Sequence, residues 1–178
     1  TGGTVWGDVS AKSAKVVYRT PRYLNTMKSG TYYLRYEISG VEFAEAMKGS
    51  LLYATGYDDY GDQYRMVYND SNKKWYYIYD QYKLYTIIKD SDLPAEARGS
   101  EVIKSVKNQQ VPTSFKSTKE QIYGETLFCE SAKVNGLNTK YCYSGTRLAF
   151  IIVDLGNGIQ VTQFISEFTN KVPNSLFT

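Results

Sequence analysis

The sequence predicts an α+β fold that is mainly antiparallel β: a curved sheet or unclosed β-barrel with helices covering its concave face. Three observations support this prediction. Thirteen of the 18 tyrosines lie between Tyr32 and Tyr85, many of them two residues apart, which is the period of a half-buried strand. Turn residues, including an Asn-Gly pair, separate the alternating runs. Residues 94–107 instead have the spacing of a helix.

The chain begins with a weakly patterned region. Residues 1–19 are predicted to form an N-terminal arm or an extra strand. A short helix is expected over residues 21–28 because Thr20 suits a cap, Pro21 suits the first helical position and Gly30 suits a terminator.

Most of the remaining elements are predicted strands. In residues 31–39, one face carries Tyr32, Leu34 and Tyr36, and the other face is mostly polar. Residues 41–47 fit either a strand or one helical turn. The polar residues 108–121 are expected to be a loop. Other strands, in a total of roughly eight to ten, are expected at residues 50–55, 63–68, 74–79, 82–88, 125–133, 137–144, 147–154 and 158–166.

Length and composition limit the class of protein. The 178 residues fit one domain, spanning residues 20–178. A net charge of +3 is too small to indicate nucleic-acid binding. No apolar run reaches the ~20 residues of a membrane-spanning helix.

The chain contains no histidine, which excludes Ser-His-Asp and Cys-His catalysis and histidine-based zinc sites. No pair of carboxylates or lysines is singled out by its spacing. The acidic loop at residues 57–62 lacks the ligand spacing of an EF-hand, so a solvated turn is predicted there. We therefore expect a protein that is not an enzyme and that has no metal site and no cofactor.

The two cysteines flank a predicted hairpin. Asn135-Gly136 is suited to a type I′ turn, which requires positive φ at both central residues. Counting outward from this turn places Cys129 opposite Cys142, on a rung where Cα atoms approach to ~4.5 Å. The spacing is compatible with a disulfide, and two reduced thiols on one face are the alternative. A bridge would favour an oxidising, extracytoplasmic compartment and would contribute about 3 kcal/mol.

The alternating aromatic side chains form the candidate site. Tyrosine suits the wall of a binding cavity because its ring buries apolar area while its hydroxyl can hold a polar group. The alternative is that these rings pack as core against the inserted helix. The candidate wall residues are Tyr36, Tyr53, Tyr64, Met66, Trp75, Tyr77 and Phe150.

The order of these elements resembles that of LolA/LolB-like lipoproteins of Gram-positive bacteria. The resemblance covers roughly residues 20–178 and rests on a short helix leading into a tyrosine-rich strand, a Lys-x-Tyr strand after a turn, and a final Val-Pro-x-Ser-Leu-Phe. The stretches that carry it are residues 29–36, 64–68, 74–79, 82–85, 147–152 and 172–177.

The resemblance implies an unclosed β-barrel whose helices enclose a hydrophobic cavity. It also implies export and membrane association through a lipidated cysteine upstream, in a secreted protein or one held on the outer face of the cytoplasmic membrane. We therefore expect a protein that binds a lipid, a lipopeptide or another amphipathic molecule. The alternative is a domain with a filled core that docks to a cell-surface protein or a cell-wall glycan.

Overall fold

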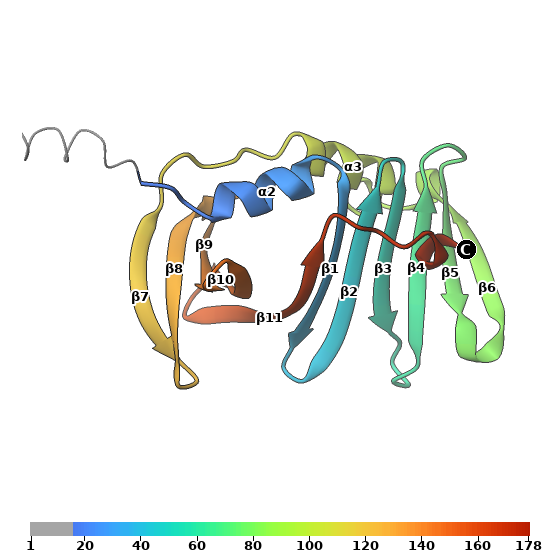
Figure 1. The fold of residues 1–178 in the computed structure, drawn as a ribbon. Coiled ribbons are helices and arrows are strands. Elements are labelled where there is room, and N and C mark those ends of the chain that lie inside the picture. Colours follow the sequence, from blue (N-terminus) through green and yellow to red (C-terminus); the bar gives the residue numbers. More distant parts are fainter. Residues whose placement is uncertain (1–15) are drawn as a thin grey trace, which may run out of the picture.

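The structure, a computed structural model, describes residues 16–178 and contains one large antiparallel sheet with two helices (Figure 1). Of the predicted N-terminal arm or extra strand, residues 1–19, the first 15 lie outside the described residues, and residues 16–19 are not part of a strand. The first part of the sheet consists of β1 (Thr31–Ile38), β2 (Val41–Lys48), β3 (Leu51–Tyr57), β4 (Gln63–Asn69), β5 (Lys74–Tyr79) and β6 (Leu84–Lys89). The second part consists of β7 (Lys116–Ile122), β8 (Glu125–Val134), β9 (Leu137–Ser144), β10 (Arg147–Gly156) and β11 (Ile159–Thr169).

The helical elements lie before the first strand, between β5 and β6, at the crossover between β6 and β7, and after the last strand. They are α2 (Thr20–Lys28), α3 (Gly99–Lys107) and the 3₁₀ helices η1 (Asp80–Tyr82), η2 (Asp90–Asp92), η3 (Ala95–Ala97) and η4 (Asn174–Phe177). The predicted helical region at residues 94–107 is thereby confirmed. Among the described residues, 16–178, no helix is long and apolar enough to cross a bilayer.

The sheet is curved and open. Its strand order is β6-β5-β4-β3-β2-β1-β11-β10-β9-β8-β7, so two meanders of neighbouring strands are joined by the pairing of β1 with β11. Strands β6 and β7 remain as edges, and the sheet does not close. This agrees with the predicted curved, unclosed antiparallel sheet.

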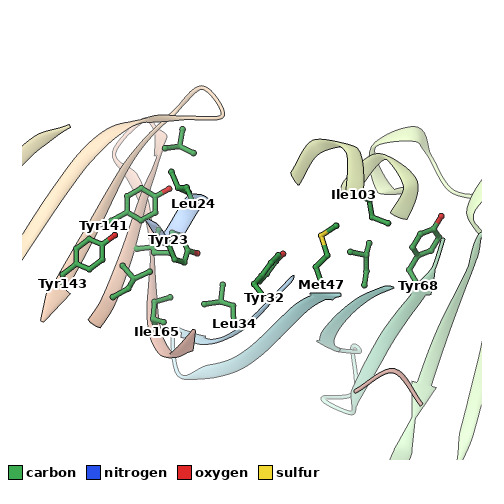
Figure 2. Packing of buried hydrophobic residues seen from close by; sticks show 14 of the residues in the cluster. Tyr23, Leu24, Tyr32, Leu34, Met47, Tyr68, Ile103, Tyr141, Tyr143 and Ile165 are labelled. Atoms are coloured by element: carbon green, nitrogen blue, oxygen red, sulfur yellow. The ribbon is translucent and has the colours of Figure 1, made fainter. Parts of the chain in front are cut away.

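Both helices lie on the concave side, along one end of the strands (Figure 1). Tyr23 of α2 packs on Tyr141 of β9 and on Phe168 of β11, with ring centroids 5.7 and 4.6 Å apart. Gly99 and Ile103 are the buried residues of α3. Figure 2 shows core side chains converging here from both walls of the sheet and from the helices. The helices thus lie on the concave side, as the sequence predicts, but they cover only one end of it.

The first residue of each α-helix donates a backbone hydrogen bond to a carboxylate from another part of the chain. Glu130 of β8 accepts hydrogen bonds from the amides of Arg19 and Thr20 and from the Thr20 hydroxyl, at 2.6–3.0 Å. Asp90 accepts from the amide of Gly99 at 2.8 Å. The prediction that Thr20 caps α2 is wrong, because its buried side chain donates to Glu130 instead of accepting from the helix. Gly30 ends α2 with φ +83°, as expected.

Two regions differ from the sequence prediction or resolve its alternatives. Residues 41–47 belong to a strand and not to a helical turn. Part of the predicted loop at residues 108–121 is the edge strand β7. An edge strand does not need an apolar face, and its exposed lysines protect it from pairing with other chains. The polar composition therefore concealed this strand.

The cysteine hairpin forms in the predicted register. Asn135 and Gly136 have φ of 52° and 79°, and Val134 faces Leu137 across the turn. Cys129 faces Cys142 with Cα atoms 4.1 Å apart, and the two are joined by a disulfide. The bridge is buried on the convex face, where it packs with Leu127. A structural disulfide is compatible with an extracytoplasmic location.

Candidate functional site

The concave side chains of β1–β5 form three rows that run across the strands. The first row lies under the helices and is closed to solvent, since each of its members is at most 8% exposed. The pairing of neighbouring strands brings together its residues, Tyr32, Met47, Leu52, Tyr68 and Trp75. This row belongs to the core (Figure 2).

The second and third rows lie progressively farther from the helices. The second row consists of Leu34, Glu45, Ala54, Met66 and Tyr77, and all except Leu34 are partly exposed. The third row consists of Tyr36, Phe43, Gly56, Tyr64 and Tyr79, all partly exposed. The second and third rows thus extend the apolar core beyond the part that the helices cover. This apolar surface is available to another molecule.

We call the large partly exposed side chains of these two rows the aromatic trough: Tyr36, Phe43, Tyr64, Met66, Tyr77 and Tyr79. Tyr36 and Phe43 stack with ring centroids 5.7 Å apart. Tyr64 lies 6.0 Å from Tyr77 and 5.6 Å from Tyr79. The rings therefore form two contacting groups on either side of Ala54 and Gly56.

Gly56 allows the ring of Tyr64 to lie against the sheet. A Cβ atom at position 56 would come within 2.7 Å of Tyr64 Cζ. Contacts this short do not occur, so the ring would have to move if position 56 carried a side chain.

The structure brings together five of the seven predicted wall residues. Tyr36, Tyr64, Met66 and Tyr77 line the trough. Trp75 lies in the covered row, where its indole donates a 3.1 Å hydrogen bond to Asp90.

Tyr53 and Phe150 require correction because both lie on the convex face. Tyr53 alternates with Leu52 and Ala54 along β3, and its ring packs near Phe177 instead, at 6.4 Å. Phe150 follows a shift in register between β9 and β10, so its ring faces Phe164 at 5.0 Å. Neither residue can line a concave surface.

The sequence prediction missed Phe43, Glu45 and Tyr79. Phe43 and Glu45 share a face with Val41 and Met47 once residues 41–47 are read as a strand. The sequence feature that could have revealed this site is Glu45, a charged residue on a strand face that is otherwise apolar. Tyr79 was not included among the predicted wall residues because it lies at the end of a predicted strand.

Glu45 lies in a weakly polar environment. Burial raises the pKa of its carboxyl group above the ordinary value. Burial, with the Glu45 charge as a second cause, also raises the pKa of Tyr36 to about 12. The trough tyrosine at position 36 is therefore a neutral phenol at physiological pH.

The hollows near the trough are open and small. One of about 120 Å³ lies beside Tyr36 and Phe43, below the ~300 Å³ at which ordinary ligand pockets begin. A ligand here would lie along an open surface. A larger hollow of about 340 Å³ lies at the far ends of β8–β11 and is lined by Lys133, Lys140 and Asp154 among others.

The acidic loop at residues 57–62 forms internal hydrogen bonds. Asp58 accepts from the amides of Tyr60 and Asp62 and from the Tyr79 hydroxyl, at 2.9–3.1 Å, as in a solvated turn. Glu120 lies near both cysteine sulfurs. Those sulfurs are joined in a disulfide and so are not thiolate ligands for a metal.

No protein-family model matches the chain, and no curated protein sequence matches it. Inference about its function therefore rests on the fold and the trough.

Proposed function

We propose that this is a non-enzymatic, extracytoplasmic binding protein that holds a lipid, lipopeptide or other amphipathic molecule on its concave face. The observation that carries the proposal is the aromatic trough, an apolar surface that continues the core beyond the helices. Rings would take the apolar part of the ligand, and tyrosine hydroxyl groups would remain available to its polar part.

Two further features support this proposal. The buried disulfide suits an exported protein. The resemblance to LolA/LolB-like lipoproteins suggests a carrier-type fold and anchoring through an upstream lipidated cysteine. The absence of histidine from the chain favours binding over catalysis.

The proposal is tested with decyl maltoside, a neutral single-chain amphiphile, in isothermal titration calorimetry below its micelle concentration. We expect the unaltered protein to bind it. Tyr77→Ala should weaken binding at least about tenfold, since burial of a large apolar side chain contributes roughly 1.5–3 kcal/mol. The matched control is Tyr76→Ala, a change at the next residue of β5, which points to the convex face.

We expect the control variant to bind decyl maltoside as the unaltered protein does. Absence of binding by the unaltered protein would contradict the proposal. Equal loss in Tyr77→Ala and Tyr76→Ala would also contradict it, because the effect would then not depend on the concave face.

A second candidate function rests on three rings of the convex face. Tyr123 is 81% exposed, and its ring lies 6.1 Å from Phe150 and 5.8 Å from Phe164. An exposed aromatic cluster of this kind suits docking to a cell-wall glycan. In a sedimentation assay with purified peptidoglycan, Tyr123→Ala should then abolish binding while decyl maltoside titrations remain unchanged. Equal sedimentation of both proteins would exclude this candidate.

A further inference from the structure

Glu45 occupies the centre of the second concave row. It lies directly opposite Leu34 on β1 and opposite Ala54 on β3. Side chains at diagonal positions of neighbouring strands lie within reach of long residues, so Tyr32 and Tyr36 flank it. On its other side the facing residue is the small Ala54, and the Glu45 side chain is partly exposed.

Among residues 16–178, Glu45 forms no hydrogen bond within 3.5 Å and no ion pair within 4.0 Å. Two other carboxylates on the concave side, in contrast, accept hydrogen bonds from the protein. Glu130 accepts from Arg19 and Thr20, and Asp90 accepts from Trp75, Gly99 and Ser100. The Glu45 side chain is only partly buried, so water can solvate its carboxylate in the free protein. Because no donor of the described residues occupies it, the carboxylate is available to a cationic group of a ligand.

The surroundings of Glu45 favour a ligand group that carries a positive charge. The three concave rows of β1–β5 contain no lysine or arginine, and Glu45 is their single charged residue. The faces of the flanking tyrosine rings carry partial negative charge, which adds to the attraction for a cation. A carboxylate between aromatic rings is a favourable site for an ammonium group.

We infer that the trough selects amphipathic ligands with a cationic, ammonium-type head group, which Glu45 binds while the apolar chain lies along the aromatic rings. This inference rests on the proposed function and specifies the chemical class of its ligand. Tyr36 and Phe43 stack beside the carboxylate with an angle of 24° between their planes, so their rings present a continuous apolar wall. Burial raises the pKa of the Glu45 carboxyl group, and a bound cation would favour its ionised form.

The test compares three amphiphiles with the same ten-carbon chain: decyltrimethylammonium, decyl maltoside and decanoate. Titrations are performed near pH 8, where ionisation of a carboxyl group is favoured over acidic conditions, with each amphiphile below its micelle concentration. We expect the unaltered protein to bind the ammonium compound about tenfold more tightly than the maltoside, the gain typical of a partly desolvated cation contact. Decanoate should bind more weakly than the maltoside.

The decisive variant is Glu45→Gln, which removes the charge but keeps the shape. It should lose the preference for decyltrimethylammonium and retain the affinity for decyl maltoside. Glu42→Gln is the matched control because it makes the same change on the convex face of the same strand. We expect this control to keep the cation preference.

The outcomes separate the inference from the proposed function. If Glu45→Gln binds the ammonium compound as tightly as the unaltered protein while decyl maltoside still binds, the cation site is excluded and the proposed function stands. If the unaltered protein binds none of the three amphiphiles, the proposed function itself fails, and the inference fails with it.

Discussion

At the scale of single residues, the carboxylates of the concave side divide into two that accept hydrogen bonds from the fold, Glu130 and Asp90, and one, Glu45, that accepts none from the described residues. Asp90 is 4% exposed and receives the Trp75 indole, the Gly99 amide and the Ser100 hydroxyl at 2.8–3.1 Å. It thereby joins the start of α3 to the sheet. Glu45, two strands from Tyr68, receives no such donors from the described residues.

Asp90 should make the stability of the protein depend on pH. Burial by itself would raise the pKa of its carboxyl group, but hydrogen bonds from Ser100, Gly99 and Trp75 outweigh this and lower the pKa. A lowered folded-state pKa stabilises the protein above the ordinary aspartate value of about 3.9, and the stabilisation is lost as the pH falls through the folded-state pKa. Asp90→Asn should therefore cost about 2–3 kcal/mol at neutral pH.

The measurement is urea unfolding of both proteins between neutral and acidic pH. The difference between them should be constant near neutrality and should shrink below roughly pH 4. Asp92→Asn, a change at an exposed carboxylate of η2, serves as the control and should have little effect. A difference that grows on acidification would contradict the assignment.

At the scale of elements, α3 is held by a close approach between its first residue and an aromatic ring. A Cβ atom at Gly99 would come within 2.5 Å of the ring of Tyr68, which is fully buried. Alanine at this position improves helix propensity by about 1 kcal/mol, but it would push the helix off the sheet. The packing effect should dominate.

We therefore expect Gly99→Ala to lower the free energy of unfolding by about 1–3 kcal/mol, the usual cost of overpacking. Thermal unfolding followed by circular dichroism measures this change. Ser105→Ala tests propensity alone, since this exposed residue lies on the same helix; it should be neutral or slightly stabilising. A Gly99→Ala protein that is more stable than the unaltered one would contradict this, because it would show that the Tyr68 ring moves aside at little cost.

The β8–β9 hairpin carries a second element-scale prediction. Its disulfide closes a sequence separation of 13 residues, and both cysteines are buried on the convex face. The double variant Cys129→Ala and Cys142→Ala should lose about 2–4 kcal/mol, because the bridge restricts the unfolded chain. Urea unfolding with and without reductant provides the measurement.

Reductant should lower the stability of the unaltered protein toward that of the double variant and should leave the double variant unchanged. A loss smaller than about 0.5 kcal/mol, the size of an ordinary surface effect, would mean that packing alone maintains this hairpin.

At the scale of the whole molecule, the two meanders unfold as one unit if their shared core controls stability. The pairing of β1 with β11 joins them, and the concave core contains residues from both, including Tyr68 and Tyr141 (Figure 2). Because unfolding of either half would expose apolar surface of the other, we expect a single cooperative transition.

This prediction is tested in a Trp6→Phe background, in which Trp75 is the remaining tryptophan of the chain. Urea unfolding followed by Trp75 fluorescence reports on β5, and far-ultraviolet circular dichroism reports on the whole sheet. The two curves should coincide. A fluorescence transition at lower urea would show that the β1–β6 meander unfolds separately.

Much of the fold was predictable because it depends on local patterns. Alternation identified most strands, and the count from Asn135-Gly136 placed Cys129 opposite Cys142 without any knowledge of the remaining chain. The strand β7 was missed because an edge strand needs no apolar alternation. The site was predicted less well, since alternation shows that two faces exist but does not show which face is the concave one.

The sequence by itself therefore predicted most of the antiparallel strands, the hairpin register that places Cys129 opposite Cys142, and an alternating aromatic face. The tertiary structure decided which rings are open: the helices cover Trp75 and leave Tyr77 accessible, and a shift in register places Phe150 on the other side. It also decided that Glu130 and Asp90 anchor the helices while Glu45 remains unpaired. The physical reason is the distance along the sequence over which each feature is decided. Strand and turn patterns arise between near neighbours, whereas exposure and pairing depend on residues brought together from distant parts of the chain.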